Sequence, residues 1–136
     1  MSDEKVVGIV LVSHSADVAA SVAELAKGLA GGAPSVPVAP AGGTEGGGLG
    51  TSAELIRAAA ASVDRGAGVA VLTDLGSAVL TVKALIAEGG ELPDGTRLLD
   101  APFVEGAVAA VVTAATGAGL DAVEAAATEA YGYRKV

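Results

Sequence analysis

The residue best suited to chemistry in this chain is His14, the only histidine among 136 residues that include no cysteine. It lies in Val12-Ser13-His14-Ser15, directly after the apolar run 6–12. That run predicts a buried strand followed by a helix, which places the imidazole at the carboxyl end of a strand. Open α/β sheets bind ligands at this edge, so a nucleophilic histidine is expected there. The alternative is a hydrogen-bonded structural histidine.

Asp74 is the expected partner of His14. It ends the apolar run 68–73, which predicts a third strand. If the first and third strands are neighbours, the carboxylate holds one ring nitrogen of His14 and leaves the other free to attack. The same carboxylate would stabilise the positive charge of a ring that has accepted a phosphoryl group. The alternative is that Asp74 only caps the helix that starts near Ser77.

Several residues near this pair are candidates for binding phosphate. Gly76 and Ser77 are expected at a helix N-terminus, where backbone N–H groups and the helix dipole favour anions. The alternative there is an ordinary strand–helix turn. The glycine-rich segment 41–50 predicts a mobile active-site loop that controls access, although a flexible linker is an equal alternative for residues 42–48. The remaining candidate phosphate contacts are Ser15, Gly50 and Thr51.

Other chemistries are disfavoured by what the sequence lacks. With one histidine and no cysteine, a metal site would have only carboxylates to add, so we expect no bound metal. Ser13 and Ser15 could be proposed as hydrolase nucleophiles. The motif Gly-x-Ser-x-Gly is absent, however, and a serine next to a histidine in sequence cannot easily share a proton with it. The glycine-rich segment also lacks the lysine of a P-loop and the spacing of a dinucleotide fingerprint.

Strand and helix patterns alternate along the chain. This predicts an α/β fold: an open, mainly parallel sheet of four strands, with five as the alternative, and helices on both faces. Residues 1–136 are expected to form one domain, with a core over about 6–131. The two prolines in 35–40 place the second strand near a sheet edge. The predicted strands are 6–12, 35–40, 68–73 and 97–100, and the predicted helices are 18–29, 51–65, 77–88, 104–115 and 120–131.

Composition narrows the classes of partner. The net charge is −8 with only eight basic residues, which disfavours nucleic acid and anionic membrane surfaces. No apolar run approaches the roughly 18 residues of a membrane-spanning helix, and the start Met1-Ser2-Asp3-Glu4-Lys5 is unlike a secretory leader. We therefore expect no membrane insertion and a cytoplasmic location, with which the absence of cysteine is compatible.

Three segments, in this order and spacing, resemble a known family: Leu11-Val12-Ser13-His14-Ser15, then Leu72-Thr73-Asp74-Leu75-Gly76-Ser77-Ala78, then Ala101-Pro102-Phe103-Val104-Glu105-Gly106. The family is that of the phosphotransfer subunits of phosphotransferase-system-dependent dihydroxyacetone kinases, whose domain is similar to mannose-class enzyme IIA. The turn after Asp74 lacks the double glycine and proline usual in mannose-class sugar carriers, which favours the dihydroxyacetone branch.

The resemblance implies a phosphotransferase component that acts only with partner subunits. His14 would accept a phosphoryl group from the histidine phosphocarrier protein and pass it to ADP on the nucleotide-binding kinase subunit. ATP formed there would phosphorylate dihydroxyacetone on a third subunit. The resemblance also implies a homodimer, with Asp74 orienting His14 and with Gly76 and Ser77 beside the phosphate. No cofactor is expected on the chain itself; ADP or ATP with Mg belongs to the partner.

Two other functions stay open. The chain could be a mannose-class enzyme IIA that passes phosphate from His14 to a sugar-transporter component. It could also be a receiver-like signalling module phosphorylated on Asp74. Receiver domains hold Mg²⁺ with carboxylates at the end of the first strand. This chain has Ser13-His14-Ser15 at that position, which favours histidine chemistry.

Overall fold

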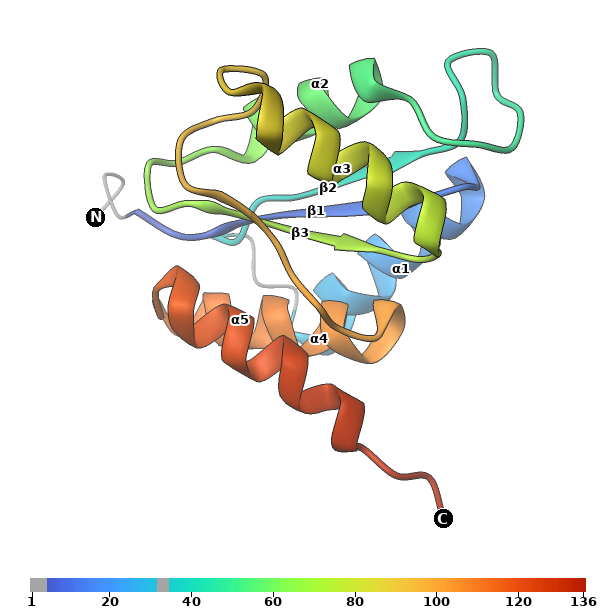
Figure 1. Ribbon diagram of the computed structural model, residues 1–136. Helices are drawn as coiled ribbons and strands as arrows, with labels where there is room; N and C mark the ends of the chain where they lie inside the picture. Colours follow the sequence, from blue (N-terminus) through green and yellow to red (C-terminus); the bar gives the residue numbers. More distant parts are fainter. Residues whose placement is uncertain (1–4, 32–34) are drawn as a thin grey trace.

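The computed structural model describes residues 5–31 and 35–136. Met1–Glu4, which carry most of the segment interpreted above as unlike a leader, lie outside the described residues. Figure 1 shows three layers, a central sheet with helices above and below it. In chain order the elements are β1 (Gly8–Ser13), α1 (Ala16–Leu29), β2 (Val38–Gly42), α2 (Ala53–Val63), β3 (Val69–Thr73), α3 (Gly76–Glu88), β4 (Thr96–Leu98), α4 (Phe103–Ala115), α5 (Leu120–Glu129) and the 3₁₀ turn η1 (Ala130–Gly132).

The sheet is open and parallel, with the strand order β2-β1-β3-β4. This confirms the α/β prediction with four strands, and it confirms that the first and third strands are neighbours. β2 lies on one side of β1 in the sheet, whereas β3 and then β4 lie on its other side. The switch in strand order therefore lies between β1 and β3, where sheets of this kind bind ligands at the carboxyl edge.

The two faces of the sheet are covered by different helices. Val7, Ile9 and Leu11 pack toward α1, α4 and α5, while Val10 and Val12 pack toward α2 and α3. The alternation follows from the two-residue period of a strand, and both faces are apolar because both are covered. Each such fully buried side chain contributes about 1.5–3 kcal/mol. The result is a rigid β1 that carries His14 at its end.

The boundaries of several elements differ from the sequence predictions. The first strand extends to Ser13, so a polar residue ends it inside the protein. The helix predicted over 51–65 begins after an N-cap at Ser52, whose hydroxyl accepts the Leu55 N–H. The fourth strand is shorter than 97–100 because only Thr96–Leu98 pair with β3. The last helix changes to a 3₁₀ turn after Glu129.

The glycine-rich loop after β2 has hydrogen bonds of its own. The Thr44 N–H donates to the Gly48 carbonyl, and the Thr44 hydroxyl accepts from the Gly48 N–H. At the loop's two ends, the Gly43 and Gly50 N–H groups donate to the carbonyls of Ser13 and His14. These hydrogen bonds hold both ends of the loop to the end of β1. The predicted control of access to the site stays a prediction.

Candidate active site

His14 and Asp74 lie side by side at the carboxyl ends of β1 and β3. His14 Nδ1 is 2.9 Å from Asp74 Oδ1, and the two side chains are 24 % and 17 % exposed. The pair forms because β1 and β3 are in parallel register, with Val12 opposite Thr73, so that Ser13, followed by His14, and Asp74 reach the same edge of the sheet. The adjacency expected from the sequence is therefore present in the fold.

The Asp74 carboxylate accepts four hydrogen bonds, two on each oxygen. Oδ1 accepts from His14 Nδ1 and from the Leu75 N–H at 2.7 Å. Oδ2 accepts from the Ser13 hydroxyl at 2.9 Å and from the His14 N–H at 3.0 Å. Burial by itself would raise the pKa of the Asp74 carboxyl, but the donors from His14, Ser13 and Leu75 outweigh it, and the pKa is lowered. Asp74 is thus an ionised carboxylate in a fixed orientation.

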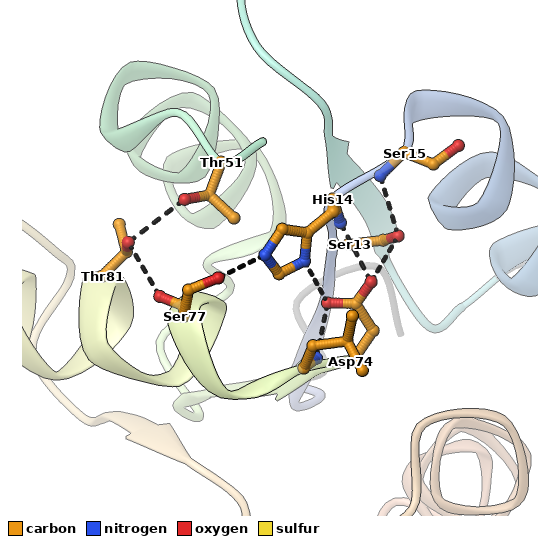
Figure 2. A network of polar contacts seen from close by, with 8 residues as sticks. Ser13, His14, Ser15, Thr51, Asp74, Ser77 and Thr81 are labelled. Atoms are coloured by element: carbon orange, nitrogen blue, oxygen red, sulfur yellow. Dashed lines mark hydrogen bonds and ion pairs between the residues drawn. The ribbon is translucent and has the colours of Figure 1, made fainter. Parts of the chain in front are cut away.

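This carboxylate determines the tautomer of His14. An ionised carboxylate only accepts hydrogen bonds, so Nδ1 must carry the proton that it shares with Asp74. In the neutral ring, Nε2 then holds the lone pair and accepts a hydrogen bond from the Ser77 hydroxyl. Figure 2 shows the ring between Asp74 on one side and Ser77 on the other. The ring nitrogen with a lone pair available for attack is therefore Nε2.

Ser77 lies in the first turn of α3, which begins at Gly76. The N–H groups of Gly76 and Ser77 have no acceptor within the helix because they start it. Together with the helix dipole they favour an anion next to Nε2. The N-cap of α3 is Leu75, and no side chain caps the helix. Asp74 therefore does not cap α3. Its carboxylate accepts hydrogen bonds from the Leu75 N–H and from Ser13 and His14 at the end of β1.

The other predicted site residues occupy defined positions around the pair. Ser15 is the N-cap of α1 and accepts the Val18 N–H, so its hydroxyl has a structural partner. Gly50 donates its N–H to the carbonyl of His14 at 2.9 Å. Thr51 Oγ1 lies 3.2 Å from Thr81 Oγ1, and the Thr81 hydroxyl in turn donates to the Ser77 carbonyl. Their contact with phosphate stays a prediction.

Sequence reasoning missed two members of this network. Ser13 is buried and hydrogen-bonded to Asp74, but it was considered only as a hydrolase nucleophile. The sequence feature that could have indicated this role is a serine at the carboxyl end of an otherwise apolar strand. Thr81 was also missed, although it follows Ser77 by four residues and therefore lies on the same side of the helix. Figure 2 shows Thr81 linking Thr51 to the first turn of α3.

A cavity of about 430 Å³ lies beside the pair, on the side toward β4. Asp74, Leu75 and Gly76 line one wall. Lys83 of α3 and Tyr131 of η1 line others, and the Tyr131 hydroxyl donates to Asp100 at 2.8 Å. The carboxyl edge of the sheet is therefore hollowed next to the His14–Asp74 pair.

Two absences hold for the described residues. Within residues 5–31 and 35–136, no three histidine, aspartate or glutamate side chains cluster as metal ligands would. None of the helices in those same ranges is both long enough and apolar enough to cross a bilayer.

Comparison with known proteins identifies relatives. The family model EIIA-man, described as the PTS system fructose IIA component, matches residues 8–124. A Listeria innocua protein named PEP-dependent dihydroxyacetone kinase 2, phosphoryl donor subunit DhaM, is 36 % identical over 107 residues, which cover 78 % of this chain and 84 % of that protein. The Escherichia coli phosphoryl donor subunit DhaM is 38 % identical over 120 residues, 86 % of this chain but 25 % of that longer protein.

Solved structures agree with the fold. The crystal structure of a protein of unknown function, EF1359, matches with a TM-score of 0.81 at 30 % identity. The match covers 96 % of this chain and 98 % of that one. A sigma-54 interaction domain protein from Enterococcus faecalis has a TM-score of 0.69 at 18 % identity, covering 95 % of this chain and 93 % of that one. The second likeness concerns the fold alone.

Proposed function

The chain belongs to the EIIA-man family, and from that premise we propose that it is a phosphotransferase component in which His14 carries a phosphoryl group between partner proteins. The observation that carries this proposal is the state of the imidazole. Asp74 holds Nδ1–H, and the lone pair of Nε2 faces the N-terminus of α3. A nucleophile next to an anion-binding turn is what a phosphoryl acceptor requires.

The proposed transfer involves His14, the Asp74 carboxylate, a phosphoryl donor and a phosphoryl acceptor. Nε2 attacks the phosphorus of the donor, the donor's bond to phosphorus breaks, and a bond from Nε2 to phosphorus forms. The proton on Nδ1 stays on the ring, which becomes a phosphorylated imidazolium paired with the Asp74 carboxylate. In the second step an acceptor oxygen takes the phosphoryl group, and His14 returns to its neutral form. Positioning and electrostatic stabilisation supply the rate enhancement.

The dihydroxyacetone kinase names of the relatives support a specific pair of partners. We propose the histidine phosphocarrier protein as donor. The acceptor is ADP on the nucleotide-binding kinase subunit, and the ATP made there serves the dihydroxyacetone-binding subunit. ADP and ATP with Mg belong to the partner, and the chain needs no cofactor of its own. We also propose that residues 1–136 act as a single phosphotransfer domain in the cytoplasm.

The surface next to the site supports docking of a protein partner. Leu49 precedes Gly50, Leu75 follows Asp74, and Leu80 lies between Ser77 and Lys83 on α3; all three side chains are strongly exposed. A partner that brings its reactive atom to Nε2 would cover apolar surface of this kind and exclude water from the transferring group.

A second exposed apolar face supports the proposed homodimer. It lies between α1 and α4, on the layer away from α3, and forms a groove of about 430 Å³. Apolar patches of this kind mark protein–protein contacts. A dimer through this face would leave His14 accessible, because the ring lies on the side of α3. The residues that line the groove are Leu25, Leu29, Val104, Glu105, Val108, Ala109, Val112 and Tyr133.

Phosphorylation of Asp74, as in a receiver domain, is disfavoured by its contacts. Both carboxylate oxygens accept two hydrogen bonds each from the described residues, so an acyl phosphate there would displace donors from Ser13, His14 or Leu75. A sugar-transporter component as acceptor is compatible with the same His14 chemistry. Only the downstream partner separates that alternative from the kinase function.

The test is reconstitution with enzyme I, the phosphocarrier protein and labelled phosphoenolpyruvate. We expect a label on His14 that is lost in acid, survives alkali and moves to ADP on the kinase subunit. His14→Gln keeps a side chain of similar size and should take up no label, which makes it the control. Label on this variant would contradict the proposal, as would alkali-labile label on Asp74. Label on His14 that ignores the kinase subunit would indicate a sugar-transport carrier.

A further inference from the structure

Ser13 is one of only two polar side chains buried among the described residues, the other being Thr73. It is the last residue of β1 and is 1 % exposed. Its hydroxyl has two partners, Asp74 Oδ2 at 2.9 Å and the Ser15 N–H at 3.1 Å. A buried hydroxyl with both roles satisfied is fixed in orientation.

The direction of each hydrogen bond is set by its partner. The Ser15 N–H can only donate, so it uses a lone pair of the serine oxygen. The Asp74 carboxylate can only accept, so the serine proton points to Oδ2. Ser13 thereby connects the start of α1 to the carboxylate that holds His14. Without this donor, Oδ2 would keep the His14 N–H as its one partner.

We infer that Ser13 is a positioning residue for phosphoryl transfer, which locks the Asp74 carboxylate so that it presents Oδ1 to His14 Nδ1 and keeps Nε2 as the nucleophile. Ser13 does not touch the ring in this structure. It acts through Asp74, by preventing rotation of the carboxylate and by stabilising its ionised form. The effect on transfer rate rests on the proposed function; the effect on Asp74 and on the His14 tautomer does not.

The charged surroundings of Asp74 allow this effect to be isolated. Among the described residues, His14 is the one titratable side chain paired with the carboxylate. Lys83, Asp100 and Tyr131 line the adjacent cavity together with Asp74, and their identities stay constant in the experiment. The donors that lower the pKa of Asp74 against the effect of burial include Ser13. Loss of Ser13 should therefore move the pKa upward.

The experiment uses Ser13→Ala, Ser13→Cys and Ser13→Thr in the full chain. Alanine removes the hydroxyl, cysteine fills the space with a much weaker donor, and threonine restores the hydroxyl. Thr73→Val is the matched control, because it removes the other hydroxyl buried among the described residues. Thr73 ends β3 just before Asp74, and the hydrogen bonds that the Asp74 carboxylate accepts come from other residues. Carbon-13 NMR of the Asp74 carboxyl reports its titration, and nitrogen-15 NMR of His14 reports the tautomer.

For Ser13→Ala and Ser13→Cys we expect an upward shift of the Asp74 titration, a smaller share of the Nδ1–H tautomer and an approximately tenfold lower kcat for phosphorylation at unchanged KM. Threonine should restore all three, and Thr73→Val should change none. The inference is overturned if folded Ser13→Cys titrates and tautomerises as wild type does. If the wild-type chain takes up no phosphoryl group, the proposed function fails while the NMR measurements still decide the role of Ser13.

Discussion

Asp74 and Asp100 are two aspartates at the same edge of the sheet, each just beyond a strand, yet their surroundings differ. Asp74 follows β3, which has a strand on both sides, and its carboxylate accepts four hydrogen bonds. Asp100 follows β4, the outermost strand of the described sheet. It is exposed, and among the described residues its carboxylate accepts one hydrogen bond, from Tyr131.

The difference shows that position in the sheet, more than residue type, determines what a carboxylate can do. A strand with a neighbour on each side is followed by a turn where main-chain N–H groups and the side chains that end a second strand converge. An edge strand offers fewer such donors. The comparison therefore predicts that equivalent substitutions at the two aspartates will have very unequal effects.

The largest expected effect comes from Asp74→Asn compared with Asp100→Asn. An amide in place of the Asp74 carboxylate loses the charge that pairs with the phosphorylated ring, and one side of it cannot accept a hydrogen bond. We expect the single-turnover rate of His14 phosphorylation to fall about 100-fold or more. Asp100→Asn should change it by less than about twofold, as for a surface substitution. Equal losses in both variants would contradict the comparison.

A moderate effect is expected on the pH dependence of stability, measured as the free energy of unfolding of wild type and of Asp74→Asn. The folded chain lowers the pKa of Asp74 below its ordinary value of 3.8, so the ionised carboxylate stabilises the native state above that pH. This contribution is lost as the pH falls through 3.8 toward the lower native value. We expect the difference in free energy of unfolding, measured with urea, to be constant near neutral pH and to diminish below 3.8. A difference that grows on acidification would reverse the sign and refute the assignment.

The smallest expected effect is a change in the titration of Tyr131, which contacts Asp100 at the outer side of the sheet. Its hydrogen bond to Asp100, followed by burial and the negative charge of that carboxylate, raises the pKa of the Tyr131 hydroxyl. Asp100→Asn removes the charge, so we expect the titration of Tyr131 to shift downward. The absorbance of tyrosinate measures this, with Tyr133→Phe as background so that one tyrosine remains. An unchanged midpoint would mean that the Tyr131–Asp100 contact does not persist in solution.

Much of the fold and the contact between His14 and Asp74 could be predicted from sequence because both depend on local patterns. Apolar runs before His14 and Asp74 predicted two buried strands, and the parallel sheet brought their ends together. Ser13 was missed because its role depends on which face of the strand end turns inward, which is a tertiary property. The same holds for Tyr131, whose place in the cavity wall depends on how the segment after α5 packs.

The loop after β2 illustrates another limit of sequence reasoning. Its composition predicted access control, but its hydrogen bonds to β1 are made by main-chain atoms, which carry no residue signature. Close packing also restricts its start: a Cβ on Gly42 would lie 2.3 Å from the Ser15 carbonyl oxygen, so this glycine is required by the approach of α1. The glycines suggested a flexible segment from sequence, whereas Gly42 is needed because the backbone at the start of α1 lies against it.

The anchoring of that loop has a consequence for how the protein can vary. The Gly43 and Gly50 N–H groups donate to the carbonyls of Ser13 and His14. Gly43, Gly47 and Gly50 all have a positive φ, which residues with a side chain rarely adopt. The length of the segment and these three glycines are therefore constrained together. Glu45 and Gly46 are open to substitution, whereas a single insertion or deletion there would displace the backbone of His14.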